Sequence, residues 1–190
     1  MFRSLFGKKK KRPPSSAQTA ETIRDARVGD VITVSGLSMV YEESYFIVEK
    51  VNRYETSSGE SHEVLGVDGD NRLWLEWSGH GAALSVAART EERPLGLERL
   101  GVNEVEMVRM DEQHSLESYV DHEDTRYYYL NSGEAFFHED KKSEGHGFYL
   151  WDFADEDGGK FASIVKWEGA PFEVYLSESV SPDRITVYRQ

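Results

Sequence analysis

Acidic and aromatic residues occur together near the end of the chain, and this combination can bind a small cation. Trp151, Asp152 and Asp155 lie within one short stretch, "YLWDFADEDGG", and Trp167 follows on the next predicted strand. Carboxylates neutralise ammonium groups, and the face of an indole ring attracts positive charge. We take these four residues as the candidate ligand-binding residues. The alternative is that the tryptophans only fill a core, as aromatic side chains of alternating strands commonly do.

Acidic turns and histidines raise the question of a metal site. Residues 68–71 and 155–158 resemble fragments of calcium loops, yet both lack the carboxylate that completes the pattern. The same residue types suit tight hairpin turns. His138 and His146 flank acidic residues, but their spacing matches no zinc pattern. The sequence therefore predicts turns and a solvated loop here, with no metal and no cofactor.

Catalytic motifs are absent from the sequence. It contains no G-x-S-x-G elbow, Walker loop, dinucleotide fingerprint, H-E-x-x-H pair or kinase signature. Carboxylates are so abundant that their proximity along the chain does not identify an acid–base pair. We therefore assign no catalytic residue and expect a protein that is not an enzyme.

The N-terminal stretch "MFRSLFGKKKKRPP" combines apolar and basic residues. Its spacing would place the apolar side chains on one face of a helical turn, beside cations that suit anionic lipid headgroups. The predicted membrane or partner contacts are Phe2, Leu5, Phe6, Lys8, Lys9, Lys10, Lys11 and Arg12. Two alternatives are an unoccupied basic tail and electrostatic binding of nucleic acid through the tail alone.

Charge is distributed unevenly along the chain. The 190 residues carry a net charge of −13, but residues 21–190 hold 16 cations against 35 anions, a balance of −19. A surface of this sign repels phosphate backbones, so nucleic acid is excluded as a partner of the folded part. The sequence has no cysteine and no apolar run long enough to span a bilayer. We therefore expect a cytoplasmic protein, with a peripheral position on the inner membrane if the tail binds lipid.

The pattern along the chain predicts a mainly β protein with a two-lobed, antiparallel, barrel-like architecture and one or two short helices. The Pro- and Ser-rich opening indicates a disordered basic tail and linker over 1–20. We place the N-terminal β lobe at 21–92, a connecting helix or loop at 93–104 and the C-terminal β lobe at 105–190.

Several local elements follow from composition. Branched and aromatic residues predict strands over 31–34, 44–54 and 104–110. Clusters of Asn, Asp, Ser and Gly predict hairpin turns at 131–133 and 157–159.

The stretches "VLGVDGDNRLWLEWSG" and "YLWDFADEDGGKFASIVKWEG" also share one sequence pattern. In each, an apolar strand is followed by an acidic turn and then by a strand that ends in Trp-x-Gly. This similarity suggests an internal duplication with Trp77 and Trp167 in equivalent places.

The stretches "RVGDVITVSG" and "YLWDFADEDGGKFASIVKWEGAPFEVYLSESVSPDRITVY" resemble a bacterial family without assigned activity, the domain of unknown function numbered 4178. The resemblance extends over about residues 28–188. It implies a cytosolic β-rich module, encoded near phage shock protein A-type coat proteins and spermidine synthase-like proteins. That setting implies an accessory role in membrane stress.

Two functions lead at this point, and a third, a metal-dependent hydrolase, stays open without a motif that supports it. The first is a non-enzymatic accessory or adaptor protein whose tail reaches the inner membrane while its acidic body binds a basic protein partner. The second is a binding domain for a small cationic ligand, such as a polyamine, held by carboxylates and tryptophans. A deep pocket lined by both residue types would favour the second function.

Overall fold

The protein is mainly β, as the sequence predicts. Its structure, a computed structural model, describes residues 22–37, 41, 44–141 and 144–190. The strands in these residues are β1 (Val31–Val34), β2 (Phe46–Thr56), β3 (Gly59–Asp68), β4 (Asn71–Ser78), β5 (Ser85–Arg89), β6 (Tyr119–His122), β7 (Thr125–His138), β8 (His146–Ala154), β9 (Lys160–Trp167), β10 (Phe172–Ser179) and β11 (Ile185–Tyr188). The helices are α1 (Glu104–Gln113) and the short 3₁₀ turns η1 (Ile23–Asp25), η2 (Gly81–Ala83), η3 (Leu97–Leu100), η4 (Glu139–Lys141) and η5 (Pro182–Arg184).

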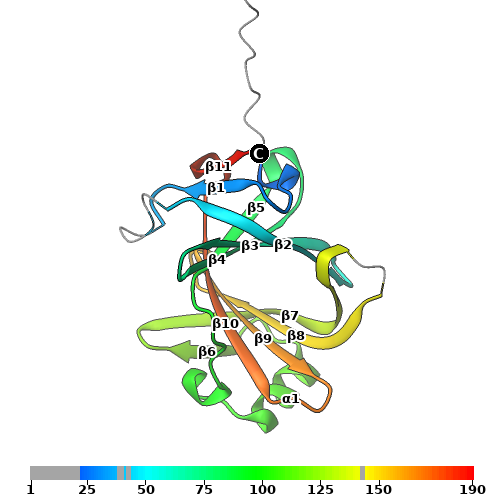
Figure 1. Ribbon diagram of the computed structural model, residues 1–190. Helices are drawn as coiled ribbons and strands as arrows, with labels where there is room; N and C mark the ends of the chain where they lie inside the picture. Colours follow the sequence, from blue (N-terminus) through cyan, green and yellow to red (C-terminus); the bar gives the residue numbers. More distant parts are fainter. Residues whose placement is uncertain (1–21, 38–40, 42–43, 142–143) are drawn as a thin grey trace, which may run out of the picture.

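Eight of the strands form a closed antiparallel barrel (Figure 1). Its order is β2-β3-β4-β5-β10-β9-β8-β7, and β7 pairs with β2 to complete the ring. The closing register runs from Arg53 opposite His138 to Thr56 opposite Ala135. The barrel-like prediction is therefore confirmed, and closure leaves none of these eight strands as a free edge.

The barrel is built from two strand meanders of the same topology. Strands β1 to β5 pair in sequence order, and so do β6 to β10; the halves join through β5–β10 and β2–β7. Strands β1 and β6 extend the sheet outside the ring. The last strand, β11, pairs with β1 and packs with the first half, although it lies within the range 105–190.

Alternating side chains divide the apolar residues among three clusters. The first core lies on the outer face of β3–β5 and includes Phe46, Leu75 and Trp77. The second core lies between β7–β10 and the segment of η3 and α1, and includes Met107 and Phe153. The third cluster fills one part of the barrel interior. Its members are Ala135, Phe148 and Val165, with Tyr54, Phe137, Leu150, Trp167 and Tyr175 packed against them.

Two glycines show why the strands fold as they do. Gly158 adopts φ +67° in the turn between β8 and β9, a backbone geometry that other residues rarely adopt. This confirms the turn predicted at 157–159. Gly66 faces the first core, where an added Cβ would lie 2.7 Å from the Cβ of Phe46. A larger residue would therefore displace a fully buried aromatic ring.

The strand predicted at 104–110 is wrong, because this segment forms helix α1. Asn103 accepts hydrogen bonds from the backbone N–H groups of Val105 and Glu106, and the Glu106 carboxylate accepts one from Asn103 N–H at 2.9 Å. This reciprocal capping box begins a helix. Met107 and Met110, three residues apart, then pack into the second core.

The hairpin turn predicted at 131–133 is also wrong. Strand β7 continues through it, with Ser132 opposite Trp151 and Gly133 opposite Leu150. A register shift between Tyr129 and Asn131 takes up the irregularity as a bulge. The turn-forming residue types thus mark a bend within one long strand.

Trp77 and Trp167 do not occupy equivalent places, contrary to the prediction. Both lie near the ends of comparable strands, β4 and β9. Trp77 packs into the first core, on the outer face of the barrel, whereas Trp167 packs in the barrel interior. The two hairpins share a topology but present opposite faces at these positions.

Candidate functional site

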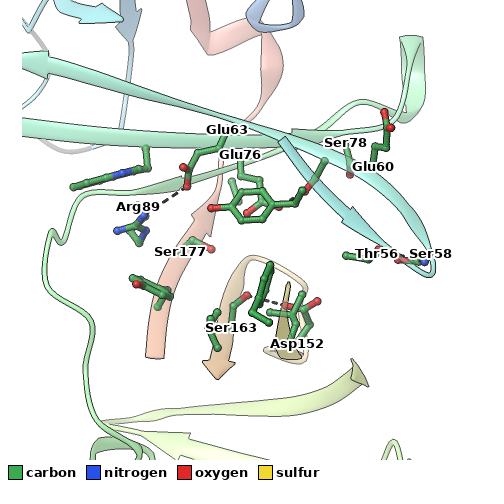
Figure 2. Close-up of a pocket in the computed structure, with 18 of the residues that line it drawn as sticks. Thr56, Ser58, Glu60, Glu63, Glu76, Ser78, Arg89, Asp152, Ser163 and Ser177 are labelled. Atoms are coloured by element: carbon green, nitrogen blue, oxygen red, sulfur yellow. Dashed lines mark hydrogen bonds and ion pairs between the residues drawn. The ribbon is translucent and has the colours of Figure 1, made fainter. Parts of the chain in front are cut away.

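The barrel encloses a cavity of about 370 Å³. Because side chains alternate along a strand, alternate residues of several wall strands line it, including Trp74 and Glu76 from β4 and Ser163 from β9. Figure 2 shows Glu63 and Glu76 above the cavity, Arg89 at one side, and Asp152 with Ser163 below. The volume and the mixture of aromatic and polar groups are typical of small-molecule sites.

An ion pair and two aromatic rings hold the guanidinium of Arg89 in place. Its guanidinium lies 3.6 Å from the Glu63 carboxylate, and their side chains are 15% and 9% exposed respectively. The same group lies 4.1 Å from the Trp74 ring centre and 4.6 Å from that of Tyr175. These cation–π contacts and the ion pair fix the guanidinium against the wall. Burial raises the pKa of the Tyr175 hydroxyl, and a hydrogen bond to Glu173 adds to the rise.

Glu63 is buried and compensated. Its carboxylate accepts a hydrogen bond of 3.0 Å from the Asn52 side chain, in addition to the Arg89 contact. Burial raises the pKa of Glu63, while the Asn52 hydrogen bond and the Arg89 charge act against that rise. Glu63 and Arg89 thus form a neutral pair within the wall.

Glu76 lies directly across from Glu63 in the β3–β4 register. It accepts a hydrogen bond of 2.7 Å from the Ser61 hydroxyl. Solvent reaches the side chain through the cavity, but the barrel walls surround it, and this burial raises its pKa to about 7. The negative charges of Glu63 and Asp152 contribute to the rise. Glu76 therefore carries a partial charge at neutral pH and has a hydroxyl as its hydrogen-bond partner.

Asp152 provides a second carboxylate on the opposite wall. It accepts a hydrogen bond of 2.8 Å from the Ser163 hydroxyl, its neighbour across the β8–β9 register. Burial raises the pKa of Asp152, and the hydrogen bonds from Ser163 and Asn131 oppose the rise. Among the described residues that line the cavity, Arg89 is the one Lys or Arg, so neither Glu76 nor Asp152 has a cation of its own.

An aromatic group forms one end of the cavity. The Trp167 ring packs 4.7 Å from Phe148 and 6.2 Å from Phe137, measured between ring centres. Its indole N–H donates to the Glu173 carboxylate at 3.2 Å, which also accepts from the Tyr175 hydroxyl at 2.9 Å. The cavity therefore offers apolar surface beside its charged groups.

The structure brings together two of the four predicted ligand-binding residues. Asp152 and Trp167 both line the cavity. Trp151 instead packs in the second core and is 6% exposed. Asp155 lies in the β8–β9 turn, where it accepts hydrogen bonds from the backbone N–H groups of Gly159 and Lys160.

Sequence reasoning missed the other half of the cavity. Glu63, Trp74, Glu76 and Arg89 were not predicted to be site residues. The signal that could have found them is the alternation of "RLWLEWS": Leu73, Leu75 and Trp77 form the apolar face, so the residues between them face the other way. No local signal shows that this second face closes into a barrel.

In the ranges that the structure describes, no group of three or more His, Asp or Glu side chains is placed to hold a metal ion. The acidic stretches at 68–71 and 155–158 connect paired strands, as predicted for turns. His138 lies at the end of β7 with its Nε2 3.5 Å from Glu55, and His146 begins β8.

The predicted N-terminal contact residues, Phe2 to Arg12, lie outside the described residues. None of the helices in the described part of the chain is long and apolar enough to cross a membrane.

The fold and the cavity define a class of protein: a closed eight-stranded β-barrel with a polar and aromatic interior and outer cores on two sides. Within this class, the chain belongs to the family described as Domain of unknown function (DUF4178), whose sequence model matches residues 27–182. The resemblance seen in the sequence is thereby confirmed. Comparisons with curated proteins and with solved structures give no match.

Proposed function

We propose that the barrel cavity binds a small organic cation. The observation that carries this proposal is that Glu76 and Asp152 line one cavity of the barrel and that each accepts a hydrogen bond from a serine hydroxyl. The lining cation, Arg89, is already paired with Glu63 and stacked on two aromatic rings. A bound cation would supply the charge that this arrangement lacks.

The negative charge of the carboxylates that line the cavity makes anions poor ligands. An anion would meet three further carboxylates and would compete with Glu63 for Arg89. A cation would instead favour the ionised form of Glu76 and lower its pKa from about 7. Binding near neutral pH therefore releases protons, and affinity falls as the medium becomes acidic.

The lining favours an organic cation over a bare metal ion. The walls include Leu150, Val165 and Trp167, which offer apolar contacts but no metal ligands. A volume of about 370 Å³ suits an amine with an aliphatic or aromatic body. This agrees with the polyamine-like ligand that was one of the functions left open by the sequence.

Isothermal titration calorimetry of the full chain with butylamine tests the proposal, with butanol as the neutral analogue. We expect heat of binding for butylamine alone, with proton release visible as a dependence on buffer ionisation enthalpy. Glu76→Gln should weaken binding about tenfold, since one carboxylate is lost. Glu117→Gln, an exposed position outside the cavity, is the matched control. Equal binding of butanol, or an unchanged affinity in Glu76→Gln, would contradict the proposal.

The basic N-terminal segment supports a second proposal, an accessory role at the inner membrane surface in the cytoplasm. Its cations and apolar residues suit anionic lipid, and the acidic body suits a basic protein partner. Co-sedimentation of the full chain with anionic liposomes tests the lipid contact. We expect binding at low salt that is lost when the cations at 8–12 are replaced by Gln. Binding that persists in this variant, or that is unaffected by salt, would refute a role for these cations.

A further inference from the structure

Glu76 and Asp152 lie on opposite sides of the ring. In the order β2-β3-β4-β5-β10-β9-β8-β7, strands β4 and β8 are four strands apart in both directions. Both carboxylates line the same cavity (Figure 2). They also both line a second hollow, together with Ser78, Ser163 and Ser177.

Each of the two carboxylates is positioned by a hydrogen bond from a serine on the neighbouring strand of its hairpin. Glu76 receives its hydrogen bond from Ser61 on the other strand of the β3–β4 hairpin. Asp152 receives its hydrogen bond from Ser163 on the other strand of the β8–β9 hairpin. Asp152 also accepts a hydrogen bond from the Asn131 side chain. A carboxylate has about four acceptor sites, so one or two donors leave further lone pairs available to a ligand. Each half of the barrel thus contributes one carboxylate that is oriented but not neutralised.

Glu76 and Asp152 lie on opposite strands of the ring and together carry two negative charges when both are ionised. A monocation neutralises one of these charges and leaves a net charge of −1 on the pair. Apolar side chains, including Leu150 and Val165, line the cavity beside these groups and can contact an aliphatic chain. The aromatic end beside Trp167 adds to this apolar surface.

We propose that the ligand is a two-ended cation, an α,ω-diamine, with one ammonium at Glu76 and the other at Asp152. This inference rests on the proposed cation-binding function and specifies the class of ligand. The two ends are recognised by the two halves of the barrel, so the length of the chain between the amines determines the fit. A diamine too short to span the cavity gains no second ion pair, and one too long cannot enter with both ends charged.

Calorimetry of the full chain at about pH 8, where Glu76 is mainly ionised, tests this inference. The probes are the diamines from ethylenediamine to hexamethylenediamine and the monoamines with the same carbon number. We expect one diamine to bind at least about tenfold more tightly than its monoamine, because a second charge-assisted contact forms. We expect both Glu76→Gln and Asp152→Asn to reduce that diamine to the affinity of the monoamine, whereas Glu117→Gln preserves the preference.

The outcomes separate this inference from the function on which it rests. If monoamines and diamines bind equally well, the two-ended ligand is refuted and the cation site stands. If no amine binds to a chain whose circular dichroism shows the β fold, both are refuted. Because Gln and Asn match the replaced side chains in size, a folded variant is expected in each case, and its thermal unfolding is the check. A preference that survives both substitutions would also overturn the inference.

Discussion

Replacement of Arg89 by methionine tests the charge balance of the cavity most directly. Methionine retains much of the apolar stem that packs between Trp74 and Tyr175 but removes the guanidinium. Glu63, whose side chain is 9% exposed, is then buried without a cation and keeps the Asn52 hydrogen bond as a partner. The free energy of unfolding should therefore fall.

The size of the loss follows from the burial of the pair. Removal of one partner from a buried ion pair costs about 3–5 kcal/mol. We expect the lower end, about 3 kcal/mol at about pH 8, because the Asn52 hydrogen bond remains and solvent reaches the neighbouring cavity.

The loss of stability in Arg89→Met also depends on pH. Burial already raises the pKa of Glu63, and removal of Arg89 raises it further. The penalty is thus fully present above that raised pKa and disappears as the pH falls below the pKa of the unfolded chain.

Urea unfolding followed by tryptophan fluorescence gives the required free energies. The protein, Arg89→Met, Glu63→Gln and the double variant form a double-mutant cycle at about pH 8 and about pH 5. We expect the double variant to recover at least half of the loss seen in Arg89→Met, because the unpaired charge is gone. A loss below about 1 kcal/mol that is independent of pH and not recovered in the double variant would refute the reasoning.

Three further predictions concern single residues. Glu76→Gln should flatten the pH dependence of unfolding: the folded-state pKa of about 7 is above the ordinary value of 4.5, so this carboxyl makes the protein less stable as the pH rises between these values. Urea midpoints at about pH 5 and pH 8 measure it, and an unchanged slope with pH would contradict it. Asn103→Ala removes the capping box of α1 and should cost about 1 kcal/mol in urea unfolding, whereas Asn103→Asp should cost far less. Gly66→Ala places a Cβ against Phe46 and should lower stability by about 1–3 kcal/mol, measured the same way; a neutral effect would show that the core can adjust.

The strands were predictable wherever one face is buried and the other is not. Residues Val31–Val34 form the predicted strand because Ile32 and Val34 alternate with less buried neighbours. Helix α1 escaped prediction since "EVEMVRM" also alternates apolar and polar residues over a short run. The decisive signals were the Asn103–Glu106 capping box and the spacing of the buried methionines.

The candidate site was only half predictable, for a physical reason. Asp152 belongs to a hairpin whose two strands are adjacent in sequence, so its acidic and aromatic neighbours are visible locally. Glu76 and Arg89 line the same cavity as Asp152 because the ring closes through β5–β10 and β2–β7, which pair residues far apart in the chain. Composition and periodicity report burial, but they do not report which distant strands complete a barrel.

The two seams that close the ring differ in extent. Strands β2 and β7 are paired at four positions, whereas β5 and β10 are paired at two, Ala88 with Glu178 and Ala87 with Ser179. Local opening costs least where the fewest backbone hydrogen bonds must break. The short seam, which one further backbone hydrogen bond from Val180 N–H to the Val86 carbonyl at 2.9 Å extends, is therefore expected to open more readily than the long one. Opening of this short seam would widen the cavity, through which solvent already reaches Glu76, and would admit a larger molecule than the closed ring allows.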